Sequence, residues 1–415
     1  MEKAETAVAL CAVGAEKVVS NELKKLAEKD GNKNPCLKVE DSLYGRVRFK
    51  ADKKGLYKAL IGLRAADRVL FEIANFKATD FDALFEGTAS AEWERLVPKG
   101  MGLKVAKVRT NRSQLKAETS IQSIVHKAAA QRLCDKYKVS RLPEQTMTRK
   151  GDDAQVKIAE VRVYIEKDIV SLLVDLSGEP LFKRGYRSEG GAAPLRETTA
   201  ASILLLSGWK RKFPLYDPFC GSGTILIEAA MYAWDMAPGL GRNFAVQDML
   251  IADAETEQQV RDEFRAKINF SGADGGRLVR IAGSDEELRS ISIATSNAAR
   301  LRDIAEGREP QRGIRNADKS LMELKVLPMA QAQSPYPDAG LLITNPPYGK
   351  RLGDQSAAEQ IYRDMASLAQ RFSGWKLAII TDHSGFESFF GKKADSCREI
   401  SNGAIPSFFY QYDVL

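Results

Sequence analysis

Apolar residues recur with both strand-like and helix-like periods along the first half of the chain. Alternating or short continuous apolar runs predict strands at residues 6–13, 42–49, 102–109, 156–165 and 169–176. Apolar residues at helical spacing predict helices at residues 56–71, 81–97 and 119–137. The turn-forming run Ser177-Gly178-Glu179-Pro180 then interrupts the pattern, and we interpret it as a domain boundary.

Strands and helices alternate regularly in the second half. Strands are predicted at residues 213–217, 278–284, 313–317, 341–344 and 376–381, with an aromatic-rich closing strand at 407–414. Helices are predicted at residues 197–206, 224–234, 287–306 and 357–372, with a charged helical insertion near 246–270. This alternation predicts an α/β domain with a largely parallel sheet and helices on both faces.

Composition narrows the classes of protein that the chain can represent. Its 415 residues are enough for two or three domains, and a hydrophobic content of 44% supports a packed core. No apolar run approaches the ~18 residues that a membrane-spanning helix needs. Five cysteines without a close pair, and only two histidines, predict neither a disulfide framework nor a metal site. We therefore expect a reduced, cytoplasmic protein with no metal and no membrane span.

The net charge of +7 is unevenly distributed. Residues 1–185 hold 35 Lys and Arg against 26 Asp and Glu, a net charge of +9. The remaining 27 basic and 29 acidic residues give residues 186–415 a net charge of −2. A basic surface attracts polyphosphate partners through counterion release, although a solvated basic face that aids solubility would have the same composition.

A glycine-containing loop follows the first predicted strand of the second half. It has the sequence Asp217-Pro218-Phe219-Cys220-Gly221-Ser222-Gly223-Thr224 and leads into a helix. Gly221 and Gly223 allow a sharp turn and a close approach of the backbone to a ligand. A dinucleotide site would have a third glycine where Leu226 stands, and a phosphate loop would contain a lysine. Asp217 would repel a pyrophosphate but can accept hydrogen bonds from the ammonium group of S-adenosylmethionine, which carries no phosphate.

A second loop, Asn345-Pro346-Pro347-Tyr348, follows the predicted strand at 341–344. The side-chain carbonyl of Asn345 and the backbone carbonyl of Pro346 can accept both hydrogens of an aromatic amino group, and Tyr348 can stack on the base. A base must be single-stranded or flipped out of its helix to reach such a pocket. Because Cys220 lies in the other loop, we interpret it as a packed thiol rather than a nucleophile.

With these two loops, the sequence resembles the class I amino-methyltransferases, and within them the THUMP-domain RNA guanine-N2 methyltransferases. This branch includes bacterial enzymes that act on 23S rRNA, related tRNA enzymes, and sequences often labelled N6-adenine-specific DNA methylases. The match extends over nearly the whole chain. It is tightest at residues 175–187, 193–198, 207–209, 217–230, 237–240 and 343–353.

The resemblance implies a fold and a set of site residues. It implies a ferredoxin-like domain at residues 1–70, a THUMP RNA-binding domain at 71–180 and a Rossmann-like methyltransferase domain at 181–415. The cofactor-binding set that it implies is Arg196, Glu197, Asp217, Phe219, Gly221, Ser222, Gly223, Thr224, Asp285, Asp318 and Asn345. Within that set Asp217, Gly221 and Gly223 line the methionine end, Asp285 takes the ribose hydroxyls and Asp318 meets the adenine. Arg196 and Glu197 belong to a segment that closes over the cofactor. Glu286 and Glu287 remain rivals of Asp285, which follows Asp217 by more than the usual ~20 residues.

The resemblance also implies a reaction, namely methylation of the exocyclic N2 of a guanosine in structured RNA, with Asn345, Pro346, Pro347 and Tyr348 at the catalytic position. The favoured substrate is 23S rRNA, and tRNA is an alternative. A DNA adenine-N6 methyltransferase would use the same catalytic loop, and the THUMP-like first half argues against it. A non-catalytic RNA-binding assembly factor is the rival from another class, and the two intact loops argue against it.

Overall fold

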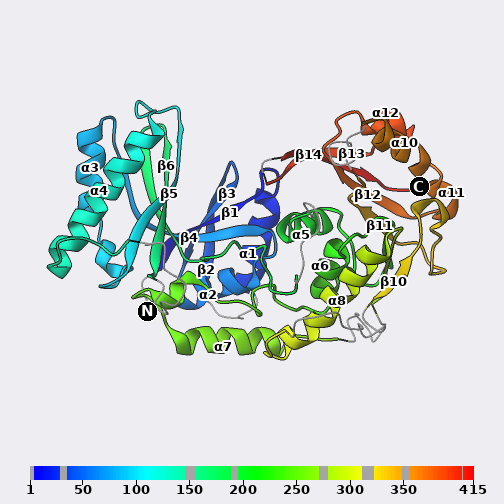
Figure 1. Ribbon diagram of the computed structural model, residues 1–415, viewed down its shortest axis with the longest axis horizontal. Helices are drawn as coiled ribbons and strands as arrows, with labels where there is room; N and C mark the ends of the chain where they lie inside the picture. The colour runs from blue at the N-terminus through cyan, green and yellow to red at the C-terminus, as the bar shows by residue number, and fades with distance from the viewer. Residues whose placement is uncertain are drawn as a thin grey trace.

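Two seven-stranded sheets organise the residues that the computed structural model describes, namely 4–28, 35–144, 156–187, 195–270, 279–310, 322–347, 355–403 and 405–415. The sheets lie side by side in an elongated molecule, with the N-terminal sheet on the left and the C-terminal sheet on the right of Figure 1. None of the described helices is long and apolar enough to cross a membrane.

The N-terminal sheet has the order β2-β3-β1-β4-β7-β6-β5. Its strands are β1 (Glu5–Cys11), β2 (Leu37–Leu43), β3 (Arg46–Ala51), β4 (Ala66–Lys77), β5 (Gly102–Asn111), β6 (Ile158–Glu166) and β7 (Ile169–Asp175). Helices α1 (Glu16–Glu28), α2 (Lys53–Gly62), α3 (Phe81–Ser90) and α4 (Glu118–Tyr137), with the short helix η1 (Trp93–Arg95), accompany it. Long strand β4 passes through residue 70, so the two predicted N-terminal domains share one sheet. Their division at residue 70 stays a prediction.

Three predicted elements of the first half are wrong. The helix predicted at 81–97 ends at Ser90 and is followed by the short helix η1. The single strand predicted at 42–49 is a hairpin, because Gly45 adopts a positive φ of 67° and turns the chain between β2 and β3. The helix predicted at 56–71 ends at Gly62, and β4 begins at Ala66. There the carboxylate of Glu22 accepts the backbone N–H groups of Arg64 and Ala65, both at 3.0 Å, and holds the chain in a turn.

The C-terminal sheet has the order β10-β9-β8-β11-β12-β14-β13, and its first five strands are parallel. Its strands are β8 (Leu215–Asp217), β9 (Ile281–Asp285), β10 (Glu323–Val326), β11 (Leu341–Thr344), β12 (Lys376–Thr381), β13 (Ser396–Asn402) and β14 (Ile405–Tyr412). Side chains of α5 (Glu197–Leu206), α6 (Thr224–Ala233) and α8 (Leu288–Ala305) pack in one core cluster with this sheet. Side chains of α10 (Gln355–Met365), α11 (Leu368–Arg371) and α12 (Phe386–Phe390) pack in the other, near η3 (Met329–Gln331). The predicted α/β sheet with helices on both faces is confirmed.

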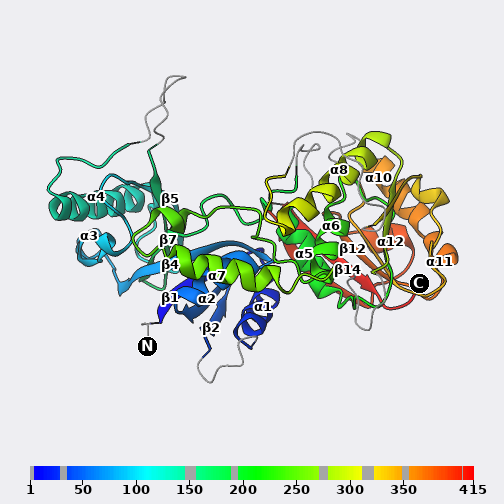
Figure 2. The same ribbon diagram turned by 90° about the horizontal axis from the view of Figure 1, so that it is seen from below.

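The strand predicted at 313–317 lies outside the described residues. The charged insertion predicted near 246–270 contains the helices η2 (Ala245–Asp248) and α7 (Ala254–Arg265). Helix α7 lies alongside α2 of the N-terminal sheet, where Lys54 pairs with Glu263 at 2.6 Å (Figure 2). Nearby, the backbone N–H of Gly239 donates to the carbonyl of Ile61 at 2.8 Å. The insertion therefore joins the C-terminal half to the N-terminal half.

Candidate active site

The predicted glycine loop connects the buried strand β8 to helix α6 at the carboxyl edge of the parallel strands. Both glycines have positive φ values, 51° at Gly221 and 82° at Gly223, which residues with a Cβ rarely adopt. A Cβ on Gly221 would meet no described atom within 4 Å, so a ligand can approach the backbone there. A Cβ on Gly223 would lie 3.0 Å from the Cβ of Ala294, so Gly223 serves the packing of α6 against α8.

Asp217 is buried at the end of β8 and accepts two hydrogen bonds. The hydroxyl of Thr344 donates to its carboxylate at 2.6 Å, and the backbone N–H of Phe219 donates at 3.0 Å. Burial raises the pKa of the Asp217 carboxyl to about 7, against these two hydrogen bonds, which lower it. A cationic ligand beside this carboxylate would favour its charged form. The ammonium group of an amino-acid-like ligand therefore fits the chemistry of this position.

Asp285 ends β9, the strand that neighbours β8. Its carboxylate accepts the backbone N–H of Gly221 at 2.9 Å and that of Glu287 at 3.0 Å. Glu286 and Glu287 are exposed, and the side chain of Glu287 accepts a hydrogen bond from Ser290 at 3.1 Å. Asp285 is thus the acid of the three that the structure ties to the glycine loop, and its role at the ribose stays a prediction.

The other loop members contribute packing and helix contacts. Phe219 is half-buried against the core cluster of α10 to α12. The carbonyl of Ser222 accepts a hydrogen bond from Asn297 of α8 at 3.2 Å. Cys220 is buried, and burial raises the pKa of its thiol well above the ordinary value. A thiol held in its protonated form agrees with the prediction of a packed residue rather than a nucleophile.

The second loop begins where β11 ends. Asn345 and Pro347 are half-buried and Pro346 is buried. The carbonyl of Pro347 accepts a hydrogen bond from the hydroxyl of Tyr362 at 3.5 Å. The same hydroxyl lies 3.1 Å from the hydroxyl of Thr381 at the end of β12. Helix α10 and strand β12 therefore brace the start of the loop. The predicted residues Tyr348 and Asp318 lie outside the described residues.

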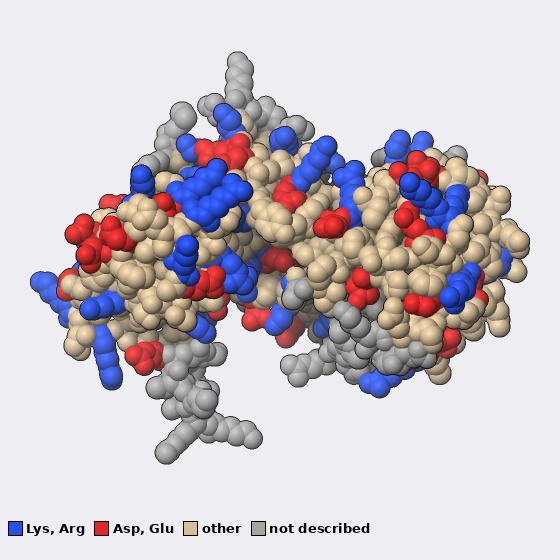
Figure 3. Space-filling model, turned by 90° about the horizontal axis from the view of Figure 1, so that it is seen from above, with Lys and Arg blue, Asp and Glu red and all other residues tan. Residues whose placement is uncertain are grey.

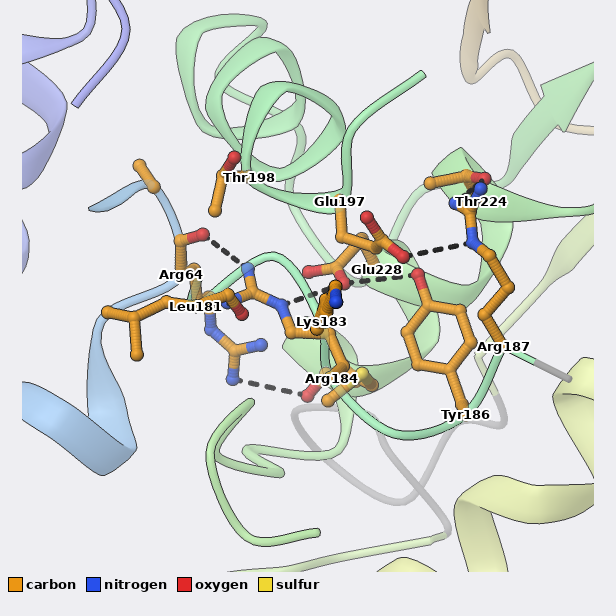
Figure 4. Close-up of polar contacts among 12 residues, drawn as sticks. Arg64, Leu181, Lys183, Arg184, Tyr186, Arg187, Glu197, Thr198, Thr224 and Glu228 are labelled. Carbon is orange, nitrogen blue, oxygen red and sulfur yellow. Dashed lines mark hydrogen bonds and ion pairs between the residues drawn. The ribbon is translucent and has the colours of Figure 1, made fainter. Parts of the chain in front are cut away.

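Arg196 and Glu197 stand together at the start of α5 but make different contacts. Glu197 pairs with Arg187 at 3.0 Å, and Arg187 donates to the Thr224 hydroxyl at 3.0 Å, so Glu197 is linked to the glycine loop (Figure 4). Arg196 lies 3.7 Å from the carboxylate of Asp67 and 4.9 Å from the ring centre of Phe182. These contacts tie Arg196 to the N-terminal half and to the linker between the two sheets (described residues 176–187) rather than to the glycine loop.

Roles for Thr344, Arg187 and Tyr362 were not predicted from the sequence. Thr344 and Arg187 stand inside matching segments, next to residues that received a role, and this adjacency was the available signal. Nothing in the sequence around Tyr362 indicated a role, because its contact with Pro347 depends on how α10 packs beside the second loop. In the part of the chain that the structure describes, no three His, Cys, Asp or Glu side chains are arranged to hold a metal ion.

The chain resembles several known proteins over most of its length. Residues 184–410 match the RMKL-like methyltransferase domain, and residues 6–70 match the RlmL ferredoxin-like domain. A Bacillus subtilis (strain 168) protein named "Putative RNA methyltransferase YpsC" is 32% identical over 413 residues, which cover 99% of this chain and 96% of that protein. The crystal structure of SMU.472 complexed with SAH has 32% identity and a TM-score of 0.79, and the match covers 100% of this chain and 99% of that one.

A longer relative covers the same region. The ribosomal RNA large subunit methyltransferase K/L of Syntrophotalea carbinolica (strain DSM 2380 / NBRC 103641 / GraBd1) is 31% identical over 97% of this chain. This chain spans about half of that protein, 52% of its length.

Fold and site together define a Rossmann-like methyltransferase preceded by a ferredoxin-like domain, the class that the sequence predicted. More particularly, the chain belongs to the RMKL-like methyltransferase family, and S-adenosylmethionine is the methyl donor of this class.

Proposed function

We propose that this protein transfers a methyl group from S-adenosylmethionine to the exocyclic N2 of a guanosine in RNA, with 23S rRNA as the favoured substrate. Family membership supports RNA methylation at the coarser level, and the base, the atom and the RNA are our proposal. One observation carries it. The Thr344 hydroxyl donates to Asp217 at 2.6 Å, so the acid at the donor site is tied to the strand that ends at Asn345. Donor and acceptor sites are therefore neighbours.

The protein's own groups mainly orient the reactants. When bound, S-adenosylmethionine supplies a methyl group activated by its sulfonium. The Asn345 side-chain carbonyl and the Pro346 backbone carbonyl accept the two hydrogens of the guanine amino group and aim its lone pair at that methyl. The bound donor would supply its methyl group and leave as S-adenosylhomocysteine, and the guanine nitrogen would release its proton to water. Tyr348 stacks on the base, which has been flipped out of its helix.

The residues of the glycine loop fit the donor. Asp217 accepts the ammonium group, Gly221 lets the backbone approach, and Asp285 accepts the ribose hydroxyls. Each oxygen of a carboxylate has two acceptor positions, so Asp285 can bind hydroxyls while it holds Gly221 and Glu287. Asp318 at the adenine completes the proposed set.

RNA binding is proposed for the N-terminal half, including the THUMP domain assigned to residues 71–180. Strand β5 and the segment after it carry exposed basic side chains and border a hollow of about 560 Å³ lined by Thr110 to Gln114 and by Lys116. Burial, and then the nearby Arg109 and Arg162, lower the pKa of Lys107, so cations already crowd one another there. A phosphate would relieve that repulsion. Viewed from above, a large group of Lys and Arg side chains lies over the N-terminal half (Figure 3).

The substitution Asn345→Ala tests the catalytic assignment. It should lower kcat by a factor equivalent to about 2–4 kcal/mol, by analogy with the removal of one positioned group that stabilises a transition state. The affinity for S-adenosylhomocysteine, measured by calorimetry, should change little. Wild-type turnover at saturating RNA would overturn the assignment. Failure of the unsubstituted protein to bind the cofactor at all would instead support the non-catalytic assembly factor, and methylation of DNA adenine would support the DNA enzyme.

A further inference from the structure

The linker between the two sheets follows one face of helix α6. Arg184 pairs with Glu228 at 3.3 Å, and the Tyr186 hydroxyl donates to the same carboxylate at 3.3 Å. One turn closer to the start of the helix, Arg187 donates to Thr224 at 3.0 Å. Because Thr224 and Glu228 are four residues apart, they lie on the same side of α6. The linker thus contacts two successive turns of the helix that begins at the glycine loop (Figure 4).

Arg187 joins three segments that are separate in the sequence. Its Nε lies 3.0 Å from the Glu197 carboxylate, and one terminal nitrogen donates to the Thr224 hydroxyl at 3.0 Å and to the Leu195 carbonyl at 3.3 Å. The side chains of Arg187 and Glu197 are only 18% and 6% exposed. The linker, the start of α5 and the start of α6 are therefore fixed to one guanidinium group.

The position of this contact relates it to the donor site. Thr224 is the first residue of α6 and directly follows Gly223, while Glu197 is the first residue of α5. Figure 4 shows Arg187 reaching between the starts of these two helices. A guanidinium group can serve both partners because its N–H groups point in several fixed directions, whereas a lysine has a single charged end. The Arg187–Glu197 ion pair therefore lies where the glycine loop ends and α6 begins.

We propose that Arg187 is a positioning residue for the methyl donor. By holding the Glu197 carboxylate beside the Thr224 hydroxyl, it fixes the mouth of the glycine loop and so the orientation of the methionine end of S-adenosylmethionine. The inference rests on the proposed donor site at Asp217, Gly221 and Asp285. Arg187 acts through Glu197 and Thr224 and does not touch the reacting atoms.

Calorimetric titration with S-adenosylhomocysteine tests this role without measuring turnover. Arg187→Gln should weaken its affinity about tenfold or more, and Arg187→Lys should fall between that variant and the wild type. In steady-state assays, KM for S-adenosylmethionine should rise while KM for RNA stays constant. Thr224→Val removes the hydroxyl acceptor with little change of shape. If the two residues act together, the double variant Arg187→Gln/Thr224→Val should bind little more weakly than Arg187→Gln alone.

Arg211→Gln is the matched control. Arg211 forms a bidentate ion pair with Asp235 just beyond the C-terminal end of α6, and both contacts are 2.8 Å long. This variant should lower thermal stability comparably but leave the affinity for S-adenosylhomocysteine unchanged. The proposal is overturned if Arg187→Gln weakens that affinity no more than Arg211→Gln does. Should Arg187→Gln fail to fold, unchanged affinity in Thr224→Val overturns it. Asp285→Ala distinguishes failure of the role proposed for Arg187 from failure of the proposed donor site. If Asp285→Ala also leaves the affinity for S-adenosylhomocysteine unchanged, the donor site itself is misplaced.

Discussion

The backbone N–H of Gly221 donates to the carboxylate of Asp285 at 2.9 Å. This hydrogen bond joins the loop after β8 to the end of the neighbouring strand β9. The glycine that leaves room for a ligand is therefore held by the acid proposed to bind the ribose. Under this proposal, loop geometry and ribose recognition would depend on the same side chain.

Asp285→Ala should weaken the binding of S-adenosylhomocysteine by about 1.5–3 kcal/mol, because the substitution removes a charged acceptor of two hydroxyls and of the Gly221 N–H. Calorimetry measures this change, and RNA affinity should stay the same. Glu286→Ala and Glu287→Ala serve as neighbouring controls. If either of them has the effect and Asp285→Ala does not, the ribose acid has been assigned to the wrong residue.

The titration of Asp217 should make the stability of the cofactor-free protein depend on pH. Burial raises the pKa of its carboxyl from 3.8 to about 7, so the folded protein binds the proton more tightly than the unfolded chain. This contribution to stability is complete below pH 3.8, declines as the pH rises, and is lost above about pH 7. The free energy of unfolding of the wild type minus that of Asp217→Asn, measured in urea from pH 4 to 8, isolates this contribution and should fall as the pH rises. A difference that is independent of pH, or that rises with pH, would contradict the expectation.

Loss of the charge of Glu228, the buried partner of Arg184, should strongly destabilise the fold. The side chains of Arg184 and Glu228 are 2% and 0% exposed, and Arg184 also donates to the carbonyl of Arg64 in the N-terminal half. Glu228→Gln leaves a buried cation without its counterion, so the free energy of unfolding should fall by about 3–5 kcal/mol. In the same linker, Glu179→Gln removes an exposed pair with Lys183 and should cost at most about 1 kcal/mol. Equal destabilisation in the two variants would show that burial of the pair is unimportant.

Charge reversal on β5 tests the RNA surface. The double variant Lys107→Glu/Arg109→Glu should weaken RNA binding. It should also flatten the salt dependence by about 0.7–0.9 log units per tenfold change in salt for each phosphate that is no longer neutralised. The full chain is the right material, because partly buried hydrogen bonds such as that from Arg184 to the carbonyl of Arg64 join its halves. The matched control is Lys376→Glu/Lys392→Glu, on exposed positions of the catalytic half. Unchanged affinity and slope in the β5 variant would make its basic side chains a solvated strand face.

Much of the catalytic half was predictable because its signals are local. The strands predicted at 341–344 and 376–381 agree with Leu341–Thr344 and Lys376–Thr381, since each is a short apolar run between polar turns. The helix predicted at 197–206 agrees with Glu197–Leu206. The loops after β8 and β11 were recognised from their own residues, and the parallel sheet then brought them to the same edge.

The errors occur where a distant residue decides the local structure. The residues at 63–71 are largely apolar and suit a buried strand as well as a helix. The decision depends on the Glu22 carboxylate, which lies 42 residues from Arg64 in sequence and binds its backbone N–H. The hairpin at Gly45 is also held from a distance, because Glu16 accepts its N–H at 2.8 Å. No window of neighbouring residues contains these contacts.

The same limit applies inside the candidate site. The residue types predicted a cofactor-binding loop after β8 and a base-binding loop after β11. They did not predict the hydrogen bond that connects the two strands at these loops. Thr344 and Asp217 are 127 residues apart, and their hydrogen bond exists only because β8 and β11 are adjacent in the sheet. Arg187 and Thr224 likewise meet only when the linker folds along α6. Roles that depend on such contacts became visible only with the structure.

The chemical identity of the methylated nucleoside tests the central claim most directly. The protein is incubated with deuterium-labelled S-adenosylmethionine and with rRNA, tRNA and DNA from a strain that lacks it. The digested nucleosides are separated by liquid chromatography and identified by mass spectrometry. We predict that the label appears in N2-methylguanosine from 23S rRNA, that wild-type RNA already carries this methylation, and that the Asn345→Ala variant transfers far less label in the same time. Label in N6-methyladenine of DNA, or in no nucleoside despite binding of the cofactor, would contradict the account.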